Sequence, residues 1–233
     1  MKSSKHFYEE PQTREDNLAD LVIDHLGDMQ LPEIFGIKRP FGIIVRLQKH
    51  LYRRNGDVDI VFVPLSNWIE TQSIDISCCM AVEVKSCHFD ESGKFKSLKP
   101  DKHKKPIERL IEEGWGRIFL CDIIESIAAE GWFHNLGFMI RDEFKKQVDI
   151  PGCGHIMTSV HPVAGRGEDL SGSIGGPEIL SKAEPFKRTS LSDFVEEALS
   201  ALFGGFIDRD RVKSVDWIIR LKWNPDKREY FEF

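Results

Sequence analysis

Three charged residues, Asp59, Glu83 and Lys85, stand in apolar segments at spacings that could bring them together. Asp59 begins one apolar segment, and Glu83 and Lys85 lie two residues apart in the next one. Alternate side chains of a β-strand point to the same face, so Glu83 and Lys85 would share a face. If the two segments form neighbouring strands, a carboxylate from each strand can meet at one place.

Such an arrangement has a specific chemistry. Two carboxylates that approach each other repel unless a cation joins them. Mg²⁺ prefers oxygen ligands and keeps several waters, so Asp59, Glu83 and the Val84 carbonyl oxygen are a suitable ligand set. A retained water can act as a nucleophile, and the cation can neutralise charge that develops on a phosphate. Lys85 could orient or deprotonate that water, or stabilise the oxyanion. The alternative is two surface acids and a solvated lysine, although an apolar strand is a costly place for charges.

The hydrophobic pattern predicts the elements that would position these residues. Asn-Gly is a strong hairpin signal, so the first two strands should pair antiparallel through Asn55–Gly56. A helix between the third and fourth strands indicates a crossover, and therefore a mixed sheet. The expected elements are a helix from Thr13 to about Gly27, strands over 42–47, 57–63 and 78–86, a helix over 103–113 with Pro106 in its first turn, and a strand over 117–123.

The last third of the chain is less regular. We expect a strand over 155–163, a loop over 165–177, a helix over 191–203 and a strand over 215–223. No linker divides the chain, which favours a single domain over 1–233. Its core would span about 13–123, followed by a C-terminal α+β extension over about 124–233. That extension could confer specificity, form a homodimer interface or regulate access to the site.

The segment Ala81-Val82-Glu83-Val84-Lys85-Ser86, preceded by Asp59 on its own strand, resembles the signature of the PD-(D/E)XK nuclease superfamily. The helix and strand expected over 104–122 also look like those that follow this motif in the family. Val58 stands where the family has proline. The resemblance covers about residues 13–123. It implies an α/β fold with a restriction-endonuclease-like αβββαβ core, in which a central mixed sheet is flanked by helices.

The resemblance also implies an activity. It indicates a metal-dependent nuclease, an endonuclease among the options, that uses Mg²⁺ or Mn²⁺ and cuts DNA with Asp59, Glu83 and Lys85 as catalytic residues. Many members place a glutamate of the first helix near the metal, and Glu15 is the candidate here. The alternative for Glu15 is an exposed first-turn acid, and Asp57 is favoured as an acid near the turn rather than a ligand.

A run of lysines follows the strand that carries Lys85. With one opposing acid, Asp101, it could contact the phosphates of a nucleic acid beside the metal. A solvated charge run is the alternative. Its proposed nucleic-acid-binding members are Lys94, Lys96, Lys99, Lys102 and Lys105. Lys102 and Lys105 are also candidates for the basic or amide residue that many family members carry on the second helix.

Composition and charge limit the classes of protein to which the chain could belong. The net charge of −6 argues against a protein whose whole surface coats nucleic acid. There is no apolar run of membrane-spanning length and no apolar region of the kind that marks a secretory signal, so neither a membrane partner nor export is expected. The five cysteines form no CxxC pair, which favours reduced thiols in a cytoplasmic protein.

Other motifs are weaker. The glycine-rich stretch over 165–172 lacks the Gly-Lys-Ser/Thr end of a phosphate-binding loop. His155 and His161 could flank a strand in the site, but lone histidines are more often structural. Two alternative functions stay open: a catalytically inactive member that binds nucleic acid or serves as an assembly module, and a hydrolase that uses the same metal chemistry on a small molecule.

Overall fold

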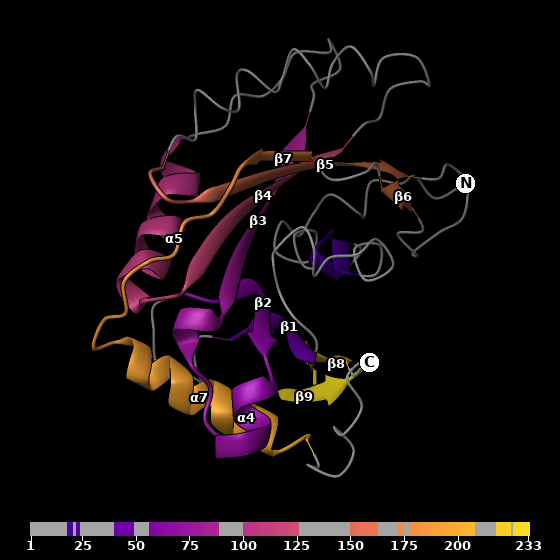
Figure 1. Cartoon of the computed structure of the whole chain (residues 1–233). Coiled ribbons are helices and arrows are strands. Elements are labelled where there is room, and N and C mark those ends of the chain that lie inside the picture. Colours follow the sequence, from indigo (N-terminus) through magenta and orange to yellow (C-terminus); the bar gives the residue numbers. More distant parts are fainter. Residues whose placement is uncertain are drawn as a thin grey trace.

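The computed structural model of the chain describes residues 18–20, 22–23, 40–48, 56–88, 100–125, 150–162, 172–174, 178–207, 218–224 and 226–233. These residues form an α/β fold with one mixed sheet flanked by helices, as the sequence predicts (Figure 1). No helix in these ranges has the length and apolar character needed to cross a membrane.

Nine strands of the described part of the chain make up the sheet, in the order β6-β5-β4-β3-β2-β1-β8-β9, with β7 also paired to β5. Their bounds are β1 (Phe41–Leu47), β2 (Val58–Pro64), β3 (Met80–His88), β4 (Arg117–Glu125), β5 (Gly154–Pro162), β6 (Gly172–Ile174), β7 (Glu178–Ser181), β8 (Ile218–Asn224) and β9 (Glu229–Glu232). β6 is a correction, because its residues were expected to be loop; they pair with Val160–Pro162 of β5.

The central pairings agree with the prediction. β1 pairs antiparallel with β2, and β2 pairs antiparallel with β3. β3 and β4 are parallel, and α5 (Pro100–Glu113) connects them as the crossover helix. β8 pairs parallel with β1, and β5 pairs parallel with β4. The C-terminal strands therefore extend the sheet at both ends of the predicted core rather than forming a separate layer.

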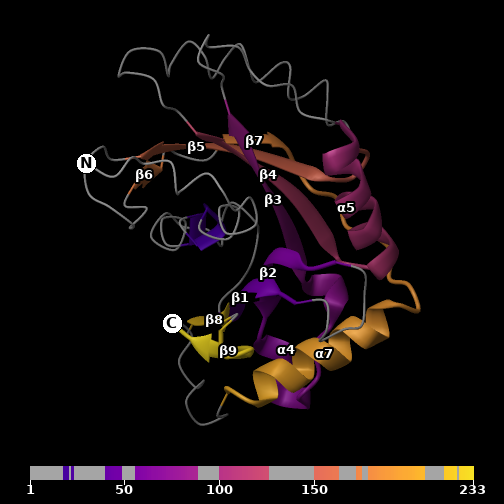
Figure 2. The same cartoon turned by 180° about the vertical axis from the view of Figure 1, so that it is seen from behind.

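Two apolar layers cover the two faces of the sheet (Figures 1 and 2). On one face, strand residues pack with Ile107 and Leu110 of α5 and with Leu199 and Phe203 of α7 (Ser192–Gly204). On the other face, the helical residues 18–20 and 22–23 bury Leu18, Ala19, Val22 and Ile23 against the strands. These residues belong to the first helix that the sequence predicts.

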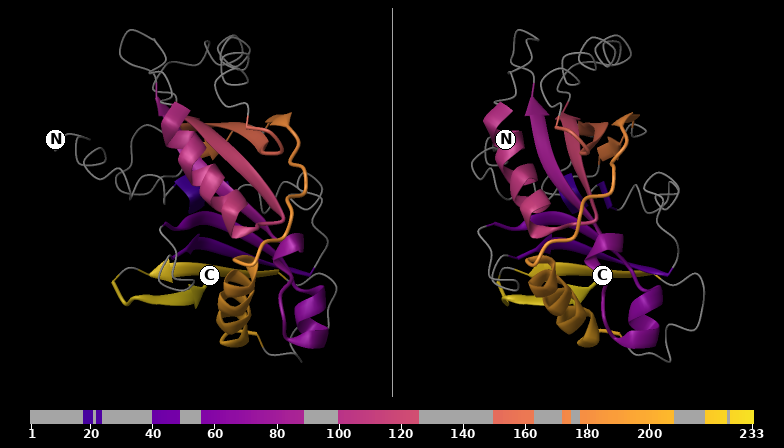
Figure 3. Two further views of the ribbon diagram at one scale, coloured as in Figure 1. Left: turned by 90° about the vertical axis from the view of Figure 1, so that its left-hand side faces the viewer. Right: turned by 60° about the vertical axis from the view of Figure 1, so that its left-hand side comes forward.

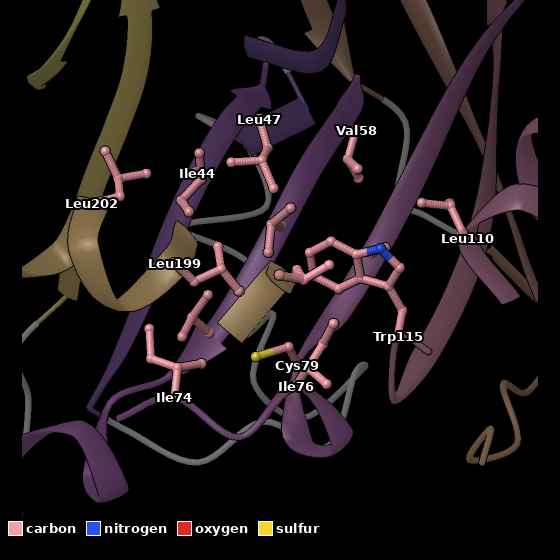
Figure 4. Close-up of a cluster of buried hydrophobic side chains, with 14 of the residues drawn as sticks. Ile44, Leu47, Val58, Ile74, Ile76, Cys79, Leu110, Trp115, Leu199 and Leu202 are labelled. Carbon is pink, nitrogen blue, oxygen red and sulfur yellow. The ribbon is translucent and has the colours of Figure 1, made fainter. Parts of the chain in front are cut away.

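The α5 face is completed by short elements at one end of the sheet. α4 (Ser66–Thr71) and the 3-10 helix η2 (Ile76–Cys78) connect β2 to β3. Trp115, which follows α5, is fully buried in the same apolar cluster as Ile76 and Cys79 (Figure 4). Its indole N–H donates to Glu113 at 2.9 Å, so the end of α5 is fixed where β4 begins.

α5 starts three residues earlier than expected, at Pro100. Pro106 therefore lies inside the helix and not in its first turn, where a missing backbone N–H costs little. His103, Ile107 and Leu110 are buried, whereas Lys104, Lys105 and Glu108 are exposed. The face of α5 that carries His103 is thus turned to the sheet, and Figure 3 shows that the helix lies along β3 and β4.

Candidate functional site

The candidate site lies where β2 and β3 part. The pairing of the two strands ends at Ile60 and Val82, although β3 continues to His88 beside β4. The same register continued by one residue places Asp59 opposite Glu83. Ala81, Val61 and Val63 belong to the apolar cluster on the α5 face. Strand alternation therefore puts the side chains of Asp59, Glu83 and Lys85 on that face as well.

Asp59 closes the fork between the strands. Its Oδ2 accepts a hydrogen bond from the backbone N–H of Val84 at 2.7 Å, where a continued ladder would have used a backbone carbonyl. Both Asp59 and Glu83 are buried, with 7% and 6% of their surface exposed. A buried carboxylate is retained at such a place only with compensating partners. The predicted acids thus sit at the end of a strand pair, inside the fold.

Lys85 supplies a positive charge to this place. Its Nζ lies 2.7 Å from Glu83 Oε1 and donates a hydrogen bond to the Val84 carbonyl oxygen at 2.9 Å. The ammonium is therefore held between two of the three oxygen groups that the sequence proposes as metal ligands. The structure brings together all three residues predicted to be catalytic.

The position of the Lys85 ammonium shows which oxygen atoms of the site can bind a cation. Glu83 Oε1 and the Val84 carbonyl oxygen converge on one cation, which here is the chain's own lysine. All the donors are hard oxygens, the type that Mg²⁺ and Mn²⁺ accept. Among the described residues, no group of three or more His, Cys, Asp or Glu side chains could hold a metal ion. The set that fits is therefore two carboxylates and a carbonyl, which would leave several positions to water.

Asp57 is engaged elsewhere. Its carboxylate forms an ion pair with Arg46 of β1 at 3.1 Å, and its carbonyl oxygen accepts a hydrogen bond from Arg109 of α5. These contacts hold the start of β2 to its neighbours. They suit the structural role that was favoured for Asp57, as an acid near the turn.

A second buried polar group continues the same face across β4 and β5. Asp122 of β4 is fully buried, and its Oδ2 is hydrogen-bonded to His155 Nε2 at 2.6 Å. Its Oδ1 lies 3.8 Å from Nδ1 of His103, on the buried face of α5. Burial, and then the negative charges of Asp122 and Asp59, raises the pKa of the Cys121 thiol. Both acids therefore act on the same part of β4.

His155 is a weak candidate from the sequence, whereas the roles of Asp122 and His103 in this group were not predicted. A signal was present in each case. Asp122 interrupts an apolar strand, as Glu83 does, and His103 stands four residues before Ile107 on the apolar face of a helix. What the sequence could not supply was the pairing of β4 with β5, because the two strands are separated by a long segment.

Only one of the remaining predicted site residues, Lys105, has a described side chain. Glu15, Lys94, Lys96 and Lys99 lie outside the described residues, as does the side chain of Lys102. Lys105 is exposed on the face of α5 that is turned away from the sheet. A loop was expected over 88–101, but Pro100 and Asp101 already belong to α5. The assignment of these lysines to nucleic acid stays a prediction.

Comparison of the chain with protein-family models, with curated proteins and with solved structures found no match.

Proposed function

We propose that this protein is a metal-dependent nuclease that hydrolyses phosphodiester bonds, with DNA as the favoured substrate. The observation that carries the proposal is the position of the Lys85 ammonium. It is bound by the Glu83 carboxylate and the Val84 carbonyl beside Asp59, at the fork of two strands. Buried oxygen atoms thus surround a cation, and a lysine stands beside two carboxylates, which are groups that metal-dependent phosphodiester hydrolysis can use.

Each residue then has a role that follows from its contacts. Asp59, Glu83 and the Val84 carbonyl oxygen would hold Mg²⁺ or Mn²⁺. The bound cation would supply an activated water and would stabilise charge on the phosphate. The Val84 N–H fixes the orientation of the Asp59 carboxylate. Lys85, released from Glu83, would hold its ammonium near the attacking water and the phosphate oxygens, where positive charge lowers the barrier.

The fold supports the proposal at a coarser level. Helical residues 18–20 and 22–23, three strands, a crossover helix and a fourth strand occur in this order along the chain, with α4 and η2 inserted between the second and third strands, and the acids lie at the fork of these two strands. This order is compatible with the restriction-endonuclease-like core that the sequence motif implies. DNA is preferred over RNA because of that resemblance, and the lysines around α5 are the proposed phosphate contacts.

The direct test is cleavage of supercoiled, linear and single-stranded DNA with and without Mg²⁺ or Mn²⁺. We expect cleavage that depends on the metal and falls by at least about 10²-fold in Asp59→Asn, Glu83→Gln and Lys85→Met. Glu70→Gln changes an exposed acid of α4 and is the matched control, with activity equal to that of the unaltered protein. Full activity in Glu83→Gln or Lys85→Met would refute the proposal.

The ion pair between Lys85 and Glu83 also favours a second candidate function, that of a non-catalytic module that binds nucleic acid. Lys85 already neutralises Glu83, so the fold satisfies this carboxylate without a metal. The two functions differ in a measurable property. Calorimetric titration with Mg²⁺ should show a binding site that Glu83→Gln weakens if the protein is a nuclease. A module without catalysis should bind DNA equally well with and without Mg²⁺ and should show no such heat.

A further inference from the structure

The group formed by His103, Asp122 and His155 has no part in the proposed chemistry. The three side chains come from α5, β4 and β5, and their exposed fractions are 3%, 0% and 4%. Burial of three ionisable groups is costly, and apolar residues of similar size at such places are often as stable or more so. A buried polar group beside a candidate site is therefore a candidate functional element.

One histidine holds the Asp122 carboxylate by a hydrogen bond, and a second histidine faces its other oxygen. His155 Nε2 is hydrogen-bonded to Oδ2 at 2.6 Å, and His103 Nδ1 faces Oδ1 at 3.8 Å. Each oxygen thus faces a different imidazole, one on a strand and one on a helix. The orientation of the carboxylate is therefore set by a hydrogen bond from β5, and the charge of its other oxygen faces α5.

Asp122 stands next to Lys85. The two residues are register partners in the parallel pair β3–β4, and neighbouring strands lie about 4.8 Å apart. Ala81 and Leu120, two residues before Glu83 and Asp122, both pack in the cluster on the α5 face. Strand alternation therefore puts Glu83, Lys85 and Asp122 on one face. Asp122 is the anion on the strand next to Lys85, on the side opposite β2.

This arrangement resolves a conflict in the proposed site. The Lys85 ammonium is bound to Glu83 Oε1 and to the Val84 carbonyl oxygen, which are also proposed metal ligands. Two cations cannot share these oxygens without strong repulsion. We propose that Asp122, held by its hydrogen bond to His155, is a positioning residue: it receives the Lys85 ammonium when a divalent cation occupies Glu83 and Val84. This inference rests on the proposed function.

A metal site at the histidines themselves is a less suitable reading. Two ligand atoms, each about 2.0–2.1 Å from one zinc ion, stand more than about 3 Å apart at tetrahedral angles. His155 Nε2 and Asp122 Oδ2 are closer than that, at a separation typical of a hydrogen bond that involves a charged group. The pair is thus arranged to orient the carboxylate.

A double-mutant cycle on Mg²⁺ affinity, measured by calorimetry, tests the inference. In the unaltered background, Asp122→Asn removes the second anion and leaves the ammonium to compete for Glu83, so the affinity should fall by about 10-fold or more. In a Lys85→Met background the competitor is absent, and Asp122→Asn should change the affinity far less. Effects of equal size in both backgrounds would mean that Asp122 acts by its charge or its packing alone, and would overturn the inference.

A second measurement uses the unaltered protein, since Asp122→Asn could disturb folding. In protein labelled with ¹³C at the lysine ε-carbons, the Lys85 signal is identified by its loss in Lys85→Met. We expect this signal to shift on addition of Mg²⁺, and the signal of exposed Lys187 to stay in place. His155→Gln, which keeps the Asp122 charge but removes the imidazole that holds it, should reduce the shift.

The outcomes separate the two proposals. If the unaltered protein cleaves DNA with Mg²⁺ and the Lys85 signal does not move, the ammonium keeps its place and the positioning role of Asp122 is wrong, while metal-dependent cleavage stands. If the unaltered protein binds no Mg²⁺ at all, the proposed function fails and this inference fails with it.

Discussion

Asp59 accepts a hydrogen bond from the backbone N–H of Val84 at 2.7 Å, across the point where β2 and β3 part. One carboxylate thus serves two purposes. It satisfies a backbone donor at the end of a strand pair, and it places negative charge opposite Glu83. The structural and the chemical roles of Asp59 can be separated by substitution, because asparagine keeps an acceptor oxygen and loses the charge.

Asp59→Ala should destabilise the protein by about 1–3 kcal/mol, because the buried Val84 N–H loses its acceptor. Asp59→Asn should cost much less, yet weaken Mg²⁺ binding as strongly as alanine does. Urea unfolding measures the first property and calorimetry the second. Equal stability of the two variants would show that the hydrogen bond contributes little.

Lys85→Met should have opposite effects on binding and on activity. Because the ammonium occupies the oxygens of Glu83 and Val84, its removal should raise the affinity for Mg²⁺. Cleavage should nevertheless fall by about 10²-fold or more, since the charge near the phosphate is lost. Thermal unfolding with increasing Mg²⁺ reports the affinity through the rise in melting temperature. Lys187→Met, at an exposed position, should leave both properties unchanged.

The exposed lysine Lys105 of α5 gives a separate prediction, about the affinity for DNA and its dependence on salt. Lys105 is exposed and belongs to the predicted phosphate-contacting run. In a Glu83→Gln background, which prevents cleavage, Lys105→Ala should weaken DNA binding. It should also make the dependence of log K on log salt shallower by about 0.9 for one lost phosphate contact. Lys187→Ala removes an exposed lysine outside the run. If both variants alter the salt dependence equally, the run has no special role.

The sequence was informative where chemistry and strand periodicity coincide. Glu83 and Lys85 were predicted to share a face, and Asp59 to meet them if the two strands are neighbours. The pairing of β2 with β3 brings the three residues to one fork, because both strands are continuous and close in the chain. Periodicity alone determines which face a side chain occupies. It does not determine which distant strands become neighbours.

The parts that the sequence could not supply depend on such distant pairings. Parallel pairing of β8 with β1, and of β5 with β4, joins residues far apart in the chain. Nothing in the local pattern of Asp122 or His155 indicates that the two side chains meet. The start of α5 at Pro100 was missed for a different reason, since a proline at position 106 favours a helix that begins just before it.

The buried thiols give a prediction that does not depend on the site. Burial raises the pKa of Cys153 to about 12 and also raises the pKa values of Cys79 and Cys121. At pH 8 these three thiols stay protonated and shielded, and the thiolate is the reactive form. An alkylating reagent should therefore modify exposed Cys78 in the native protein, and should modify Cys79, Cys121 and Cys153 only on unfolding. Peptide mapping by mass spectrometry identifies the sites, and rapid labelling of Cys121 in the native protein would contradict the described core.

Gly116 joins three segments of the fold, because it follows α5 and is hydrogen-bonded both to η2 and to the segment before α7. Its N–H donates to the Ile76 carbonyl at 3.0 Å, and its own carbonyl accepts from Phe186 N–H at 2.9 Å. A Cβ at this position would lie 2.0 Å from the backbone oxygen of Ser77. Because that obstacle is backbone, the strain cannot be relieved by a rotamer change. Gly116→Ala should therefore lower the free energy of unfolding by about 1–3 kcal/mol.

Gly204→Ala is the matched control. No atom beyond its own helix backbone lies within 4 Å of the added Cβ, and alanine at this exposed helix position should be neutral or stabilise by up to about 1 kcal/mol. Urea unfolding of the two variants measures the difference, and equal stability would mean that the contact between Gly116 and Ser77 is looser than the structure has it.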